Sequence, residues 1–151
     1  MIKYLGYFLL GLFAVMIIFT VIKNNIRSKD FYLTNGRFVE LPKTPNAVST
    51  QTIYPEKLVE PMRFKNSLNE SKEKLLIALK KYGGYNISKD EGNIIQLVFT
   101  TKLMRFKDDA VFYFDEEEKL IHFRSASRIG YSDMGLNRKR YEEIKKYYEE
   151  E

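Results

Sequence analysis

The stretch that decides the fold is LIHFRSASRIGYSDMGLNRKR, residues 120–140. It begins with hydrophobic residues that predict a strand, and this strand runs directly into an Arg/Ser-rich turn. A loop that contains Gly130 and Gly135 follows, and a basic helix begins after it. The stretch therefore predicts a strand and a helix that are joined by a polar, positively charged loop.

The residues before this stretch predict a partner strand. Residues 109–114 and 119–125 flank an acidic turn at 115–118, and we expect them to pair as an antiparallel hairpin. A loop with an even number of residues sets Asp109 opposite Arg124, so the hairpin predicts an ion pair between these side chains. The opposite face of the hairpin should be core: Ala110, Phe112, Phe114, Ile121 and Phe123.

The rest of the chain supplies helices and further strands. An S-x-x-E capping box and apolar residues at helical spacing predict a helix over residues 68–81. Strand composition is found at residues 85–88 and 94–102, and a second helix is expected at 136–149. The predicted fold class is α+β: an antiparallel sheet of about four strands with two helices on one face, preceded by one N-terminal transmembrane helix.

Three motifs together resemble a known family. They are residues 124–140 of the stretch above, PNAVS at 45–49 and FKDD at 106–109. On these motifs the chain is similar to DUF1499, a domain of unknown function, over residues 42–147. Where the family pattern often has a cysteine, this chain has Ala47. The resemblance implies where the domain lies and names no reaction.

The basic charge is concentrated at the N-terminal end. The formal net charge is +5, but four of the 25 Lys and Arg residues precede Asp30, which leaves 21 basic against 20 acidic residues. This near balance argues against nucleic acid as a partner and assigns the basicity to a membrane-proximal end. The absence of cysteine excludes disulfides and thiolate chemistry, and with one histidine no metal site and no cofactor is predicted.

Residues 4–22 carry no charge and predict a membrane anchor. As a helix they extend roughly 28 Å, which is close to the ~30 Å hydrocarbon core. A cleaved signal peptide is the alternative, but the run is long for one and Thr20–Lys23 offers no small-x-small cleavage site. We expect a single-pass membrane protein with residues 1–23 as anchor, 24–41 as juxtamembrane tether and 42–151 as the domain. A count of Lys and Arg favours a cytoplasmic domain, whereas the short lead before Lys3 favours export; we expect an extracytoplasmic domain.

The Arg/Ser-rich loop is the candidate ligand site. Guanidinium groups beside hydroxyls and a helix N-terminus commonly hold phosphate or carboxylate. The alternative is an internal network in which Asp108, Asp109 and Asp133 neutralise the arginines. The candidate ligand-binding residues are Arg124, Ser125, Ser127, Arg128, Asp133, Asn137 and Arg138.

Two functions of different class follow. The first is a non-catalytic, membrane-anchored domain that binds a small anion, a lipid headgroup or a protein partner through this loop. The second is a hydrolase or transferase that uses Asp109, His122 and Arg124. A lone histidine on the outer face of a hairpin is more often a solvated side chain than a base, and no nucleotide-binding or nucleophile motif is present. The first function is therefore preferred.

Overall fold

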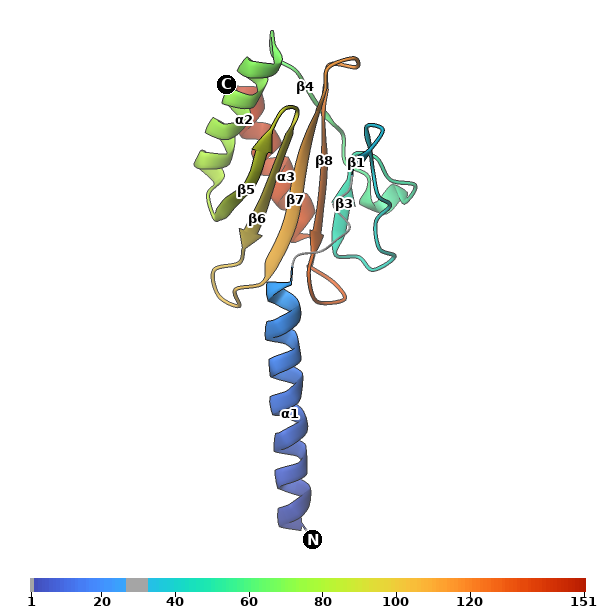
Figure 1. Ribbon diagram of the computed structural model, residues 1–151, viewed down its shortest axis with the longest axis vertical. Coiled ribbons are helices and arrows are strands. Elements are labelled where there is room, and N and C mark those ends of the chain that lie inside the picture. Colours follow the sequence, from blue (N-terminus) through green and yellow to red (C-terminus); the bar gives the residue numbers. More distant parts are fainter. Residues whose placement is uncertain (1, 27–32) are drawn as a thin grey trace.

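The computed structural model describes residues 2–26 and 33–151 and shows an α+β domain behind a long N-terminal helix (Figure 1). The helices are α1 (Ile2–Asn25), α2 (Leu68–Tyr82) and α3 (Leu136–Glu150), and the short 3-10 helix is η1 (Pro55–Lys57). The strands are β1 (Leu33–Thr34), β2 (Arg37–Phe38), β3 (Ala47–Ser49), β4 (Met62–Arg63), β5 (Tyr85–Glu91), β6 (Ile94–Thr100), β7 (Lys107–Asp115) and β8 (Leu120–Ser127).

The main sheet is antiparallel and has α2 and α3 on one face, as predicted (Figure 1). Its order is β3-β8-β7-β6-β5, and β4 pairs with a second part of β8. The sheet thus has six strands, more than the four or so expected. The additional strands β3 and β4 contain three and two residues, and so short a segment cannot show the alternation that identifies a strand in sequence.

The β7–β8 hairpin has a different register from the predicted one. Asp109 lies opposite Ala126, and Arg124 lies opposite Val111. The predicted pairing of Asp109 with Arg124 is therefore wrong by two residues. A shift by an even number leaves each side chain on its predicted face. The five predicted core residues are accordingly all buried: Ala110, Phe112, Phe114, Ile121 and Phe123.

The hydrogen bonds of the turn explain this register. Strand pairing continues to Asp115 and Leu120, so the loop consists of the four residues between them. The Asp115 carboxylate accepts hydrogen bonds from the backbone N–H groups of Glu117 and Glu118, at 2.9 and 3.0 Å. Lys119 adopts a left-handed backbone with φ of 55°. The Asp115 side chain thus organises the turn, an effect that strand composition does not reveal.

Both predicted helices form and pack on the sheet. The Ser67 hydroxyl accepts a hydrogen bond from the Glu70 N–H at 3.1 Å and caps α2, as the capping box indicates. The core between helices and sheet includes three residues of each helix, all at most 1% exposed: Leu75, Ala78 and Leu79 from α2, and Tyr141, Ile144 and Tyr148 from α3.

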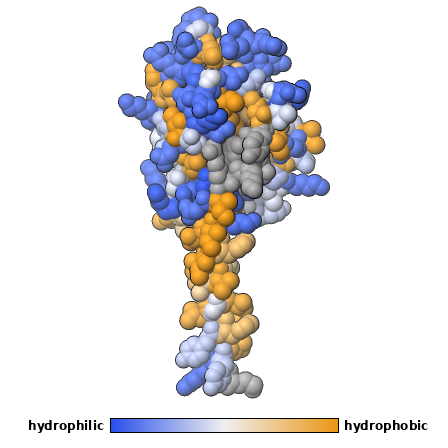
Figure 2. Space-filling view, viewed as in Figure 1, coloured by the Kyte–Doolittle hydropathy of each residue, from blue (hydrophilic) through white to orange (hydrophobic). Residues whose placement is uncertain are grey.

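The N-terminal helix α1 projects from one end of the domain (Figure 1). Within the described residues it is the one helix that is long and apolar enough to cross a membrane, and none of its apolar window is buried in the protein. Figure 2 shows its apolar surface against the largely hydrophilic domain. The β1–β2 unit packs on the sheet through Phe38, which is buried against Val111. This part of the segment expected as a tether therefore lies on the domain.

Candidate functional site

Arg128, in the Arg/Ser-rich segment, is held in a buried ion pair. Its Nε and Nη2 atoms donate to the two carboxylate oxygens of Asp109 at 2.9 and 2.6 Å. The two side chains are 6% and 2% exposed. The Arg128 Nη1 atom donates to the backbone carbonyl of Asn24 at 3.2 Å. Arg128 therefore connects β7 with the end of α1.

Arg140 is held in the same way by the neighbouring carboxylate. Its Nη2 atom lies 2.8 Å from Asp108 Oδ2, and both side chains are 3% exposed. The other oxygen of Asp108 accepts a hydrogen bond from the Ser127 hydroxyl at 2.5 Å. The Arg140 guanidinium lies over the Phe99 ring, 4.3 Å from its centroid. This pair ties the sheet to α3.

Asn137 joins three segments of the chain. Its Oδ1 atom accepts hydrogen bonds from the Ser125 hydroxyl at 2.6 Å and from Arg140 Nη1 at 2.7 Å. Its Nδ2 atom donates to the Asn46 carbonyl at 3.3 Å, and the Asn46 side chain donates to the Gly130 carbonyl at 2.8 Å. The proline-rich segment of residues 42–61, β8 and α3 are thereby connected by one buried polar network.

The remaining predicted site residues also bond within the protein. The Asp133 carboxylate accepts from two backbone N–H groups at the start of α3, at 3.0 and 2.9 Å. Arg138 donates to two backbone carbonyls beside η1, at 2.8 and 3.0 Å. Arg124 is 1% exposed and donates to the Val39 carbonyl at 3.2 Å. Asp133, Arg138 and Arg124 therefore each bond to backbone groups of the protein itself.

The same network fastens the end of α1 to the domain. Asn24 is 9% exposed; its Nδ2 atom donates to the Arg105 carbonyl at 2.8 Å, and its Oδ1 atom accepts from the Lys107 N–H at 2.9 Å. The Asn25 side chain accepts a hydrogen bond from Lys107 Nζ at 2.7 Å. With the bond from Arg128 to the Asn24 carbonyl, these contacts clamp the last turn of α1 to the start of β7.

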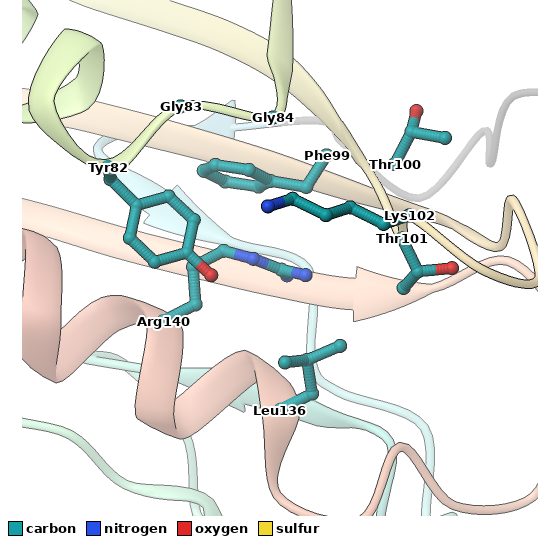
Figure 3. A pocket seen from close by; sticks show the side chains of 9 residues that line it. All are labelled: Tyr82, Gly83, Gly84, Phe99, Thr100, Thr101, Lys102, Leu136 and Arg140. Carbon is teal, nitrogen blue, oxygen red and sulfur yellow. The ribbon is translucent and has the colours of Figure 1, made fainter.

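A cavity of about 320 Å³ lies beside the Asp108–Arg140 pair. Figure 3 shows Lys102 reaching across it from the loop after β6 toward Phe99 and Arg140. Lys102 is exposed, and no carboxylate among the described residues forms an ion pair with it. The lining combines apolar, polar and cationic residues: Tyr82, Gly83, Gly84, Phe99, Thr100, Thr101, Lys102, Leu136 and Arg140.

The single histidine is buried, contrary to the expectation of a solvated side chain. His122 is 6% exposed, its Nδ1 atom lies 3.1 Å from the Thr50 hydroxyl, and its ring stacks on Tyr113. Burial lowers the pKa of His122, although the charges of Glu118 and Asp115 act in the opposite direction. The neutral imidazole is therefore favoured in the folded protein.

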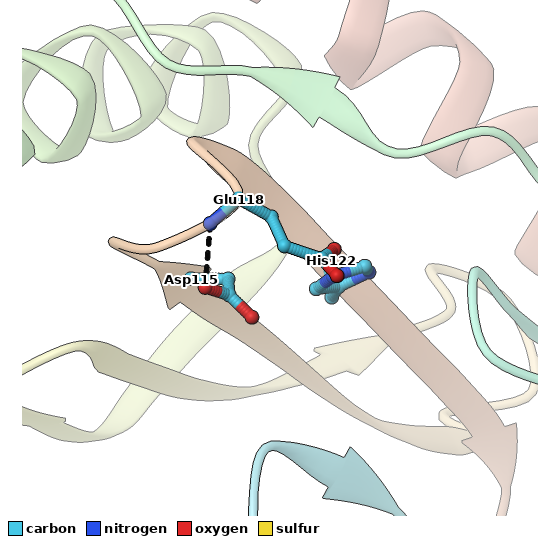
Figure 4. A group of neighbouring side chains, drawn as sticks. All are labelled: Asp115, Glu118 and His122. Atoms are coloured by element: carbon cyan, nitrogen blue, oxygen red, sulfur yellow. Dashed lines mark hydrogen bonds and ion pairs between the residues drawn. The ribbon is translucent and has the colours of Figure 1, made fainter.

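His122, Asp115 and Glu118 form a small cluster at the far end of the hairpin from α1 (Figures 1 and 4). Their ligand atoms lie within 4.8 Å of one another, a spacing that a metal ion can bridge. One Asp115 oxygen is already engaged by the turn, and Glu118 lies 3.6 Å from His122 Nε2 as an ion-pair partner. These internal contacts account for the cluster.

The structure separates Asp109 from His122, two of the three candidate catalytic residues, along the hairpin. His122 lies opposite Tyr113, which is four residues from Asp109 on β7. At about 3.3 Å per residue this separates them by roughly 13 Å along the strand. Asp109 binds Arg128, and His122 contacts Thr50. Asp109 and His122 therefore do not contact each other, and each has its own bonding partner.

The fold and these contacts define an α+β domain that is fastened to an apolar N-terminal helix. A family model described as "Protein of unknown function (DUF1499)" matches residues 38–147, and the chain belongs to this family. No curated protein and no solved structure matches the chain. The three motifs that carry the resemblance contribute Asn46, Asp108, Asp109, Arg128, Asn137 and Arg140 to the network described above.

Sequence reasoning did not single out Asn24 or Lys102. Asn24 follows the apolar run and has the composition of a tether, so its burial depends on tertiary contacts that no local pattern shows. Lys102 is one of 25 basic residues, and its position over a cavity follows from the packing of α2, α3 and β6. The sequence feature that could have indicated Lys102 is the basic stretch of residues 102–107, which has three basic residues before Asp108.

Proposed function

We propose that the protein is a non-catalytic, single-pass membrane protein whose domain binds an anionic phosphate group in the cavity that Lys102 and Arg140 line. The phosphate belongs to a lipid headgroup or to a free anion. The observation that carries the proposal is Lys102, a cation without a carboxylate partner among the described residues, over a cavity of about 320 Å³. Cavities that hold small ligands begin at roughly this size.

The membrane part of the proposal rests on α1. Its apolar window is exposed along its length, and a soluble protein does not leave such a surface uncovered. The clamp at Asn24 then holds the domain at the membrane surface. The end of β6, which contributes to the cavity lining, is on the side of the sheet that faces α1 (Figure 1). An extracytoplasmic position of the domain remains our expectation from the sequence.

The cavity suits an amphiphilic anion better than the Arg/Ser-rich segment does. In that segment Arg128 and Arg140 each bind a buried carboxylate, so their charge is compensated internally. In the cavity the Lys102 ammonium can approach a phosphate, while the Phe99 and Tyr82 rings provide an apolar wall for the adjoining carbon atoms. Arg140 contributes a positive edge, although Asp108 neutralises much of it.

The test is a thermal melt of the full chain in detergent with short-chain lipids. Dihexanoyl phosphatidic acid should raise the melting temperature, and dihexanoyl phosphatidylcholine should not. Lys102→Gln should weaken the affinity about tenfold, the effect of losing ~1.4 kcal/mol from a charge-assisted hydrogen bond. Lys80→Gln, which removes an exposed lysine of α2 outside the cavity, is the matched control.

Inorganic phosphate separates the two sources of the anion. An equal stabilisation by phosphate alone would assign the cavity to a soluble anion, and stabilisation by the lipid alone would assign it to a headgroup. The proposal is contradicted if neither anion stabilises the protein, or if Lys102→Gln and Lys80→Gln respond alike.

A further inference from the structure

Two loops of the domain lie against the end of α1. One is residues 101–106 between β6 and β7, and its Arg105 carbonyl accepts the Asn24 hydrogen bond. The other is residues 128–135 between β8 and α3, and its Arg128 side chain donates to the Asn24 carbonyl. Figure 1 shows both loops at the α1 end of the sheet. The hydrogen bonds at Asn24 therefore fix the position of both loops along the axis of α1.

The second loop lies beside α1 at the level of Phe19 and Thr20, which belong to the apolar run of the helix. A hollow of about 350 Å³ separates them, and it is lined by Phe19, Thr20 and Lys23 of α1 and by residues 128–130. The uncharged run ends at Ile22, so Asn24 lies two residues, or about 3 Å, beyond it. If α1 spans the bilayer, both loops lie at the boundary between headgroups and acyl chains.

Both loops expose large apolar side chains at this height. Leu103 is 89% exposed and Met104 62% in the first loop, and Tyr131 is 74% and Met134 97% in the second. Outside α1, the one other described large apolar residue above 60% is Ile53. Exposed apolar side chains therefore concentrate at the α1 end of the domain, and such a concentration marks an interaction surface.

Basic residues accompany these apolar side chains. Lys102, Arg105 and Lys107 lie in or next to the first loop, and Lys23 lies on the last turns of α1. The first loop has no acidic residue, and the acidic residue of the second loop, Asp133, accepts hydrogen bonds from the backbone N–H groups of Gly135 and Asn137. Apolar tips surrounded by cations match the interface of an anionic bilayer, which attracts basic residues near its surface.

We propose that residues 101–106 and 128–135 form a second membrane contact, with Leu103, Met104, Tyr131 and Met134 inserted into the interface of an anionic phospholipid bilayer. The partner of this surface is the bilayer that α1 crosses, because the hydrogen bonds at Asn24 hold both loops next to the end of that helix. The inference rests on the membrane anchoring proposed above and does not require a ligand in the cavity that Lys102 lines. The domain is thus attached at three points and its orientation on the membrane is fixed.

Depth-dependent fluorescence quenching tests this contact directly. The natural chain has no cysteine, so single cysteines can be labelled with an environment-sensitive fluorophore in the full chain. The positions are Leu103→Cys and Met134→Cys in the loops, Phe13→Cys in the middle of α1, and Glu117→Cys in the β7–β8 turn. The protein is reconstituted into vesicles of three parts phosphatidylcholine to one part phosphatidylglycerol that carry nitroxide lipids, and iodide is used as the aqueous quencher.

We expect the loop labels to lie roughly 5–10 Å into the headgroup and acyl boundary, shielded from iodide, and the Glu117 label to lie in water. Quenching of the Phe13 label by lipid without quenching of either loop label overturns the loop contact and leaves the anchor intact. A Phe13 label that lipid does not quench overturns both. Loop labels that are shielded from iodide but not quenched by lipid contradict the proposal and indicate contact with protein, such as a second copy.

The role of the charges is tested in the same vesicles. Lys102→Gln with Arg105→Gln should place the Leu103 label nearer the water in phosphatidylglycerol vesicles and leave it unchanged in pure phosphatidylcholine. An unchanged depth in both lipids would contradict the choice of an anionic bilayer as the partner.

Discussion

Asp108 and Asp109 are neighbours in sequence but serve opposite faces of the sheet. Successive residues of a strand point in opposite directions. Asp108 therefore binds Arg140 of α3, and Asp109 binds Arg128, which also contacts the end of α1. Each aspartate neutralises one buried arginine, and together they connect the helical layer, the sheet and α1.

The first prediction concerns the buried Asp109–Arg128 pair. Arg128→Ala should lower the free energy of unfolding by ~3–5 kcal/mol, because it leaves the Asp109 carboxylate buried without its partner. Urea unfolding of the full chain in detergent measures this loss. Lys139→Ala, at an exposed position of α3, should stay within about 0.5 kcal/mol of the wild type. Equal effects of the two substitutions would show that Arg128 has no structural role.

The second prediction concerns His122 and pH. Its folded pKa lies below the ordinary value of 6.5 because the ring is buried, so the unfolded chain binds the proton more tightly. The contribution of the neutral His122 to the free energy of unfolding is fully present above pH 6.5. It is lost as the pH falls from 6.5 through the lower pKa of the folded protein. Glu118 and Asp115 oppose this effect, and Arg37 adds to it.

Unfolding free energies at pH 7.5 and 5.5 measure the effect. The wild type should be less stable at the lower pH, and His122→Gln should reduce this dependence. The same slope in both proteins would show that other groups account for it.

At the level of elements, the helices were predictable and the small strands were not. A capping box and apolar spacing predicted α2 and its buried residues, and both features act locally. The faces of β7 and β8 were also correct, because alternation alone determines them. Their register was not, because it depends on the hydrogen bonds that Asp115 makes within the turn.

The third prediction concerns the clamp between α1 and β7. Asn24→Ala removes the partners of the Arg105 carbonyl and the Lys107 N–H in a largely buried position, so we expect a loss of about 1–3 kcal/mol. Amide hydrogen exchange at Lys107 should become faster. Asn25→Ala removes only exposed side-chain hydrogen bonds, one of them to Lys107 Nζ, so it should cost less and leave the Lys107 N–H protected. Unchanged protection of Lys107 in Asn24→Ala would mean that α1 is not fastened in this way.

At the scale of the whole molecule, the candidate site was predicted only in part. The sequence predicted that the arginines of residues 124–140 lie close together. The structure binds Arg128 to Asp109, Arg140 to Asp108 on the other face of the sheet, and Arg138 to backbone carbonyls beside η1. Whether such a group binds a ligand or the protein itself depends on distant carboxylates and carbonyls. Those partners are brought close by the hairpin register and by the wrapping proline-rich segment, which local patterns do not determine.

The last prediction concerns the anchor, on which the proposed arrangement of the domain at the membrane depends. The measurement is the intact mass of the protein in membranes that have been washed with alkaline carbonate. We expect the uncleaved chain of 17.9 kDa in the membrane pellet, because the apolar window of α1 is exposed and long enough to span. Recovery of the intact chain in the supernatant, or of a chain shortened by the loss of α1, would contradict the account.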